Sequence, residues 1–189
     1  MATAAVFLDR DGVINKDKGY VSQIDDFEFI EGSIEAMQLL KTHGYLLVVI
    51  TNQSGIARGY YTEDEFMTLT EWMDWSLADR GVDLDGIYYC PHHPEKGLGD
   101  FKQDCLCRKP NTGMLDSAVK ELDIDLSQSF LVGDKLSDIQ AGQKLQLKAN
   151  YLVSTGKVLC EKGSEAADAV FTDLLSAAKS IVNDLICTV

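Results

Sequence analysis

Two acidic residues separated by a single residue stand directly after an apolar stretch near the N-terminus. Ala4 to Leu8 is apolar, and Asp9, Arg10, Asp11 and Gly12 follow it. Side chains two positions apart in an extended chain lie on the same side. Both carboxylates can therefore face one crevice, where one would act as a nucleophile and the other as a general acid and base. The alternative is a polar turn, because Asp and Gly favour turns, and this segment taken alone slightly favours the turn.

Three further polar segments, each placed where a strand would end, change that balance. Thr51 to Gly55 offers hydroxyl and amide groups that can donate hydrogen bonds to phosphate oxygens. Arg108 to Pro110 is basic, and Gly133 to Asp138 combines acidic and basic residues at a predicted strand-to-helix turn. Because the chemistry of open parallel sheets lies beyond the carboxyl ends of the strands, these segments can converge on one site. Together they indicate phosphate chemistry.

The four motifs, in this order, resemble those of the haloacid dehalogenase superfamily of phosphohydrolases. The resemblance implies a Rossmann-like core in which Asp9 attacks phosphorus in line and forms an aspartyl-phosphate, which divides one hard hydrolysis into two easier steps. Asp11 would protonate the leaving alkoxide and then activate the water that cleaves the intermediate. We therefore expect a phosphoric monoester hydrolase.

Cations are needed beside these carboxylates, because two carboxylates repel a phosphate group. On the resemblance, we assign Asp9, Asp134 and the backbone carbonyl of Asp11 as oxygen ligands of a catalytic Mg²⁺. Lys109 would supply a fixed positive charge, and the Thr51 hydroxyl would hold the equatorial phosphate oxygens. These residues would reverse the local electrostatic field inside an acidic protein.

Cysteine and histidine residues crowd one long polar segment. Cys90 and His92 are followed by Cys105 and Cys107, so two close pairs supply four nitrogen and sulfur donors. This pattern favours a closed, structural Zn²⁺ site over the alternative of buried thiols and a surface histidine. His92 is preferred over His93 only by the resemblance to a family. Such a site would fix the basic pair that follows it directly, and no disulfide is expected.

Within the superfamily, an Asp-x-Asp-Gly motif together with this zinc loop resembles the histidinol-phosphatase and heptose-bisphosphate-phosphatase group. Thr51 to Gly59 and Gly86 to Pro94 carry the likeness to the heptose members, and it fades after about Gln143. It implies removal of the C7 phosphate of D-glycero-β-D-manno-heptose 1,7-bisphosphate, to give the heptose 1-phosphate. That product would serve the synthesis of ADP-heptose for lipopolysaccharide cores.

A bisphosphate has a second anionic end, which must be bound without being hydrolysed. Arg58, Arg108 and Lys18 are basic residues beyond those that the chemistry needs, although a solvated surface charge is equally expected for Lys18 and for Arg58. Asp138 has two open roles, since it could orient Lys135 or the metal waters, or could favour the start of a helix as an acid. The expected substrate-binding residues are Asp17, Lys18, Gly19, Tyr20, Asn52, Gln53, Ser54, Arg58, Arg108 and Lys135.

Other functions remain possible from these motifs. Histidinol-phosphate phosphatase shares the nucleophile and the zinc loop, but Ser54, Arg58 and the long spacing from His92 to Cys105 favour the heptose substrate. A phospho-aspartate signalling domain also combines acidic residues, a hydroxyl and a lysine on an α/β sheet. Such a domain has no need for the acid at Asp11.

The elements that must position these residues alternate between strands and helices. Apolar runs of strand length are Ala4 to Leu8, Tyr45 to Ile50, Ile87 to Cys90, Phe130 to Val132 and Tyr151 to Val153. Helical patterns cover Ser33 to Thr42, a segment that begins at the Thr62 capping box, and a segment from about Asp173. The sequence predicts one domain, residues 1–189, built as a Rossmann-like three-layer α/β sandwich. Its central sheet would be mainly parallel, with a minimal cap formed by loops and a zinc-binding loop.

Composition limits the partners. The chain has 17 basic and 30 acidic residues, a formal net charge of -13 and a pI near 4.5, which disfavours nucleic acid and anionic membranes. The N-terminal residues lack a secretion signal, so we expect a cytoplasmic protein. We also expect a monomer that acts on a small sugar bisphosphate. An odd count of five cysteines suits a reducing compartment. No role is indicated for Cys160 or Cys187.

Overall fold

A parallel sheet forms the centre of the molecule. The computed structural model describes residues 2–156 and 161–186. The sheet contains six strands in the order β3-β2-β1-β4-β5-β6, and all of its pairings are parallel. The strands are β1 (Ala5–Leu8), β2 (Leu46–Asn52), β3 (Gly86–Cys90), β4 (Phe130–Gly133), β5 (Ala149–Val153) and β6 (Ala169–Phe171).

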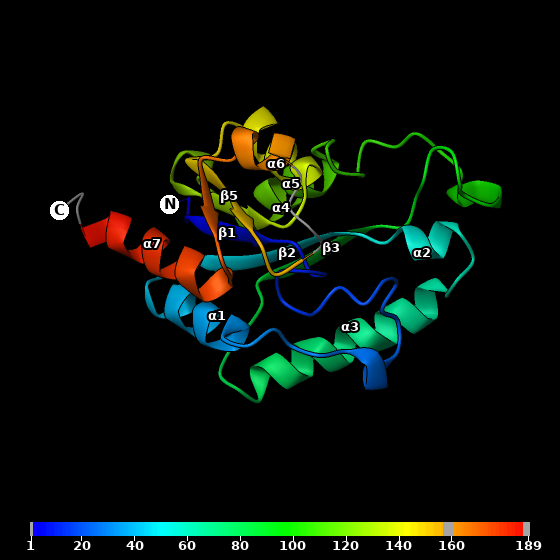
Figure 1. Ribbon diagram of the computed structural model, residues 1–189, viewed down its shortest axis with the longest axis horizontal. Helices are drawn as coiled ribbons and strands as arrows, with labels where there is room; N and C mark the ends of the chain where they lie inside the picture. The colour runs from blue at the N-terminus through cyan, green and yellow to red at the C-terminus, as the bar shows by residue number, and fades with distance from the viewer. Residues whose placement is uncertain (1, 157–160, 187–189) are drawn as a thin grey trace.

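Helices cover both faces of the sheet, as Figure 1 shows. One face packs against α1, α3 and α7, and the other against α4 and α5, so the core is divided into two apolar layers. This arrangement explains why β1 is buried along its whole length and is apolar throughout. The helices are α1 (Ser33–Thr42), α2 (Ser54–Ala57), α3 (Glu63–Ala78), α4 (Gly113–Leu122), α5 (Leu136–Lys144), α6 (Glu161–Ala166) and α7 (Leu174–Ile186).

The five predicted strands and the three predicted helices are all present. Thr62 and Glu65 form the reciprocal capping box at the start of α3, and α1 ends before Gly44, whose φ is 83°. The short strand β6 was not predicted, because its three residues, although apolar, form too short a run to stand out as a strand, and Val170 is exposed. Cys160 and Cys187 lie outside the described residues.

The register of the central strands brings their polar ends together. Leu8 pairs with Val49 on one side and with Val132 on the other. The chain then continues from β1 into Asp9, whose N–H donates to the Val132 carbonyl at 3.1 Å. The motifs that follow β1, β2 and β4 therefore begin at the same edge of the sheet.

The long segment after the first motif folds back beside this edge. Asn15 forms an isolated antiparallel bridge with Phe29, and the N–H of Lys16 donates to the Glu28 carbonyl at 2.9 Å. This loop supplies the small cap that the sequence predicts. Among the described residues, no helix combines the length and apolar character needed to cross a membrane.

Candidate active site

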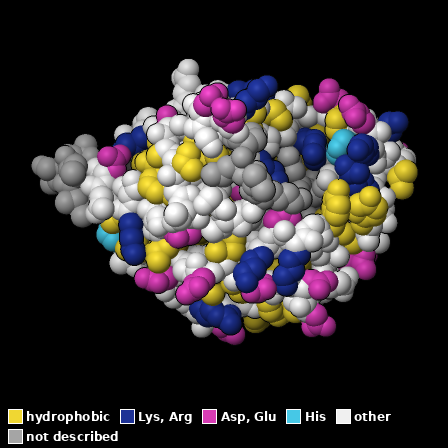
Figure 2. All heavy atoms as spheres, viewed as in Figure 1, with side chains coloured by type: hydrophobic (Ala, Val, Ile, Leu, Met, Phe, Trp, Pro, Cys, Tyr) yellow, Lys and Arg dark blue, Asp and Glu magenta, His cyan; other side chains and the backbone are white. Residues whose placement is uncertain are grey.

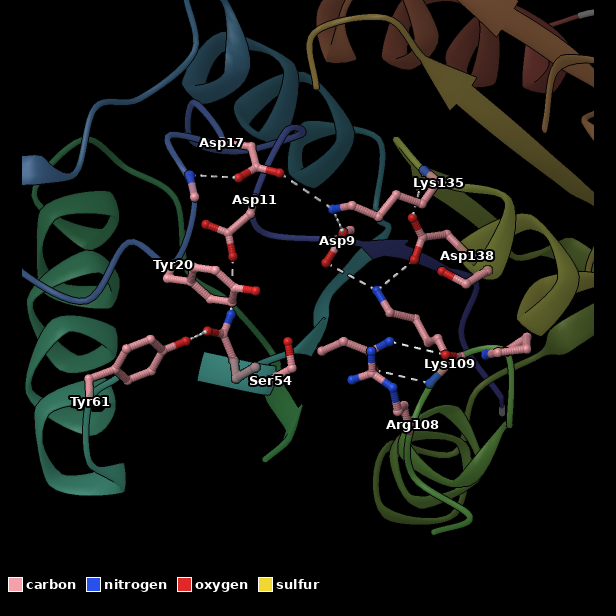
Figure 3. Close-up of a pocket in the computed structure, with 15 residues that line it drawn as sticks. Asp9, Asp11, Asp17, Tyr20, Ser54, Tyr61, Arg108, Lys109, Lys135 and Asp138 are labelled. Carbon is pink, nitrogen blue, oxygen red and sulfur yellow. Dashed lines mark hydrogen bonds and ion pairs between the residues drawn. The ribbon is translucent and has the colours of Figure 1, made fainter. Parts of the chain in front are cut away.

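A cavity of about 420 Å³ opens at the carboxyl ends of β1, β2 and β4 (Figure 3). It brings together most of the residues that the sequence singles out for chemistry or substrate binding. The residues that line it are Asp9, Asp11, Asp17, Gly19, Tyr20, Asn52, Gln53, Ser54, Tyr61, Arg108, Lys109, Pro110, Lys135, Ser137 and Asp138.

The ammonium group of Lys109 lies at the bottom of this cavity between two carboxylates. Its Nζ is 3.0 Å from Asp9 Oδ1 and 2.8 Å from Asp138 Oδ1, and it donates to the Ile50 carbonyl at 2.7 Å. The Asn52 side chain accepts from the Lys109 N–H at 3.0 Å and donates to the Lys109 carbonyl at 3.1 Å. Lys109 is therefore fixed at its backbone and at its side-chain end.

These contacts set the charge state of the buried pair. Burial opposes ionisation of Asp9, but the ammonium groups of Lys109 and Lys135 outweigh it, so the pKa of Asp9 lies below its usual value. Burial likewise opposes the charge of Lys109, yet Asp138 and Asp9 raise its pKa above the ordinary value. Asp9 is thus a carboxylate, which is the form that a nucleophile needs.

Asp134 has the properties of a cation ligand. Its carboxylate oxygens are buried and make no hydrogen bond, although Oδ1 lies 3.1 Å from Lys135 Nζ. Burial and the nearby Asp9 raise the pKa of Asp134 to about 7. Oxygen atoms of Asp9, Asp134 and Asp138 lie within 4.8 Å of one another. This donor set fits a hard divalent cation such as Mg²⁺, which would compensate the buried negative charge.

Gly12 allows the first motif to lie against Asp134. Its φ is +91°, and a Cβ at this position would stand 2.5 Å from Asp134 Oδ2. A side chain here would be strained and would displace the carboxylate.

Asp11 is held by three side chains. Arg10 Nη2 lies 2.9 Å from both oxygens of Asp11, Asn15 Nδ2 donates to Oδ1 at 3.0 Å, and Gln53 Nε2 donates to Oδ2 at 3.1 Å. Arg10 is 1% exposed and also donates to the Val21 carbonyl. The sequence prediction missed Arg10 and Asn15, which read as ordinary members of a polar turn.

Lys135 connects the motif after β4 to the loop after β1. Its Nζ lies 3.7 Å from Asp17 Oδ2 and 3.9 Å from Asp9 Oδ2. Gly19 and Tyr20 line the cavity on the same loop. The loop therefore closes one side of the cavity, as the sequence predicts for a small cap.

Besides Asp134 and the proposed zinc ligands, three predicted residues do not line the cavity: Lys18, Arg58 and Thr51. Lys18 pairs with Glu28 at 3.3 Å on an exposed part of the loop. The guanidinium of Arg58 lies over the Tyr20 ring, 5.8 Å from its centre. Thr51 is 1% exposed, and its Oγ1 accepts from Gln53 Nε2 at 2.8 Å.

The predicted cysteine and histidine ligands form a second cluster beside the cavity. The Sγ atom of Cys90 lies 3.4 Å from that of Cys105 and 2.9 Å from that of Cys107, while His92 Nδ1 lies 3.4 Å from the Cys107 sulfur. Sulfur ligands of a tetrahedral zinc ion stand about 3.8 Å apart, so the sulfurs of this cluster are closer together than in a zinc site, although the set of ligands has the right composition. His93 is not part of this cluster. Its Nδ1 accepts from the backbone N–H groups of Glu95 and Lys96.

The cluster is connected to the cavity through Arg108. Its Nη1 donates to the His92 carbonyl at 3.2 Å, and Asn111 Nδ2 donates to the Cys105 carbonyl at 2.9 Å. A metal in the cluster would therefore hold the segment that carries Arg108 and Lys109.

Comparison with known proteins shows which class of hydrolase this chain belongs to. A family model described as HAD-hyrolase-like matches residues 106–177. The chain is 61% identical over 177 residues to D-glycero-beta-D-manno-heptose-1,7-bisphosphate 7-phosphatase of Pasteurella multocida (strain Pm70), with 94% of this chain and 96% of that protein covered. It is 58% identical to the Escherichia coli (strain K12) protein of the same name, with 94% and 93% covered.

A solved structure extends the likeness to the fold. D,D-heptose 1.7-bisphosphate phosphatase from B. bronchiseptica, complexed with magnesium and phosphate, superimposes with a TM-score of 0.81 at 32% identity, covering 96% of this chain and 99% of that one. The chain is therefore a hydrolase of the haloacid dehalogenase class. Within that class it belongs to the family of D-glycero-β-D-manno-heptose-1,7-bisphosphate 7-phosphatases. The resemblance that the motifs indicate is confirmed.

Asp138→Asn tests whether the second carboxylate holds Lys109. The amide keeps the shape but removes a buried counter-charge, so we expect kcat to fall about 10- to 100-fold, with some loss of thermal stability. Steady-state kinetics and thermal unfolding measure both effects. Asp116→Asn, at an exposed position on α4, is the matched control. An unchanged kcat in Asp138→Asn would show that Asp9 alone suffices to fix the lysine.

Proposed function

We propose that this chain hydrolyses the C7 phosphate of D-glycero-β-D-manno-heptose 1,7-bisphosphate and releases the heptose 1-phosphate and inorganic phosphate. One observation carries the proposal. Asp9, Asp11 and Lys109 meet in one cavity, with Asp134 buried beside them, in a chain 61% identical to a phosphatase named for that substrate. The reaction belongs to ADP-heptose synthesis for lipopolysaccharide cores. Cytoplasmic location and a monomeric state stay predictions from the sequence.

The chemistry assigns Asp9 as the nucleophile. An Asp9 oxygen attacks phosphorus and forms an aspartyl-phosphate, while the bond between phosphorus and the C7 oxygen breaks. Asp11 gives its proton to the leaving oxygen, and it then takes a proton from the water that cleaves the intermediate. Lys109 holds a phosphate oxygen with a charge that Asp138 keeps in place. Bound Mg²⁺, held by Asp9, Asp134 and the carbonyl of Asp11, would neutralise the phosphate charge.

We assign the distal phosphate to the basic groups at the mouth of the cavity. Arg108 and Lys135 line it, whereas Arg58 and Lys18 do not. Arg108 is the better candidate, since a guanidinium can bind a phosphate through two parallel hydrogen bonds. These two neighbouring residues would then have separate roles, because Lys109 contacts the nucleophile Asp9 while Arg108 lines the cavity.

Asp9→Asn should abolish turnover and keep the fold, because the amide preserves the shape but cannot attack phosphorus. Asp11→Asn should lose general acid catalysis, typically ~10² to 10⁴ in rate. Phosphate release with the heptose bisphosphate measures both, and thermal unfolding confirms that the variants fold. Near wild-type turnover by Asp9→Asn would show that Asp9 is not the nucleophile.

The cysteine cluster is proposed to hold one structural Zn²⁺ per chain, with no open coordination position. Cys107→Ala should lose the metal, and with it the activity that depends on the order of the following basic pair. Elemental analysis of protein purified without chelator measures the zinc content. His92→Ala should also lose zinc, while His93→Ala should retain it. Zinc-free wild-type protein with full activity would contradict this assignment.

Arg108→Ala should erase most of the preference for the bisphosphate over a heptose 7-phosphate that lacks the C1 phosphate. A lost charge-assisted contact is typically worth roughly 10- to 100-fold in specificity. Lys109→Ala should instead destroy hydrolysis of both substrates. The measurement is kcat/KM for each substrate, and Arg80→Ala, at an exposed position in the turn after α3, controls for loss of a positive charge. If Arg108→Ala leaves the preference unchanged, another group must bind the distal phosphate.

A further inference from the structure

Gln53 stands between Tyr61 and the two polar groups that the proposed chemistry uses on this side of the cavity. Tyr61 Oη donates to Gln53 Oε1 at 2.5 Å, and Gln53 Nε2 donates to Asp11 Oδ2 at 3.1 Å and to Thr51 Oγ1 at 2.8 Å. In Figure 3 a dashed line joins Tyr61 to this amide, and Asp11 lies on the other side of it. The four side chains form one continuous chain of hydrogen bonds.

The chain of hydrogen bonds has one direction. The NH₂ group of Gln53 faces Asp11 and its oxygen faces Tyr61, an orientation that suits the carboxylate left on Asp11 once its proton has passed to the leaving group. The Tyr61 hydroxyl then has to donate. Burial raises the pKa of Tyr61 to about 12, so the hydroxyl keeps its proton.

Local structure is built to bring Tyr61 to this place. Tyr61 is 5% exposed and packs in a small apolar cluster with Ile56 and Phe66. A Cβ on Gly55 would stand 2.1 Å from the Tyr61 ring, so only glycine permits this approach. The glycine of the motif after β2 therefore serves the tyrosine that follows it.

We propose that Tyr61 is a positioning residue for the general acid, which it controls by locking the orientation of the Gln53 amide. Without the hydroxyl, the Gln53 oxygen has no donor, and the amide can turn over. The turned amide would present an oxygen to Asp11 and would repel the carboxylate that forms there as the proton passes to the leaving group. Asp11 would then lose a hydrogen bond that holds it in the cavity. This inference rests on the proposed role of Asp11 and adds a residue outside the four motifs.

The test compares Tyr61→Phe with wild type on two substrates. A sugar alkoxide needs a proton to leave, whereas p-nitrophenolate leaves without one, and kcat/KM reports only the steps through departure of the leaving group. We expect kcat/KM for the heptose bisphosphate to fall roughly five- to tenfold, with KM unchanged, and that for p-nitrophenyl phosphate to stay near wild type. Equal losses on both substrates, or no loss on either, would overturn the proposal.

A double-mutant cycle separates this role from general packing. If Tyr61 acts through the amide, Tyr61→Phe should cause no further loss in a Gln53→Leu background. Additive losses would overturn the proposal. Tyr88→Phe is the matched control, since it removes a hydroxyl bonded to Glu121 at 2.7 Å outside the cavity. Thermal unfolding of each variant shows that it folds.

Asp11→Asn in the same assays separates this inference from the proposed function. An active Asp11→Asn would overturn both. An inactive Asp11→Asn beside a Tyr61→Phe with wild-type kinetics would overturn only the role of Tyr61.

Discussion

The buried ammonium group of Lys109 is the charge on which the site depends. It lies between Asp9 and Asp138, and Lys135 adds a second ammonium beside Asp9 and Asp134. Two positive groups thus face three carboxylates, and burial together with the negative charge of Asp9 raises the pKa of Asp134. A phosphate group would increase the imbalance. The same arrangement that keeps Asp9 ionised therefore requires a further cation before an anionic substrate can bind.

The chemistry of three motifs could be predicted from the sequence because they follow β1, β2 and β4, and parallel strands end at one edge. The expectation that Arg108 to Pro110 also stands where a strand ends was wrong, since a long loop separates this segment from β3. Asp138 could not be assigned, since an acid at a helix start and a counter-ion look alike in a sequence. In the structure it does both, because it accepts from the Lys135 N–H at 3.0 Å and pairs with Lys109. Arg10 and Tyr61 were missed for a different reason. Their contacts depend on how the turns after β1 and α2 fold back, which local patterns do not encode.

The cysteine cluster contacts the long segment between β3 and α4, which carries Lys109 and has little secondary structure of its own. The segment from β3 to α4 has only a short 3-10 helix, Gly99–Phe101, between its ends, yet it delivers Lys109 to the centre of the site. The Asn52 side chain fixes the backbone of Lys109, and the cluster contacts the segment just before it through the bond from Arg108 to the His92 carbonyl. A metal bound by Cys90 and Cys107 would join the end of a strand to this loop. Such a link replaces secondary structure with coordination bonds.

The acidic surface limits how an anionic substrate can be recognised. Figure 2 shows Lys and Arg side chains set among Asp and Glu side chains on the face it displays, rather than gathered in one basic track. With a net charge of -13, long-range attraction of a sugar bisphosphate is weak or absent. The Debye length is ≈ 8 Å at physiological ionic strength, so only charges close to the substrate act strongly on it. Arg108, Lys109 and Lys135 all lie within the cavity. Recognition therefore depends on short-range contacts inside the cavity, where polar side chains and a bound cation can tell one phosphate ester from another.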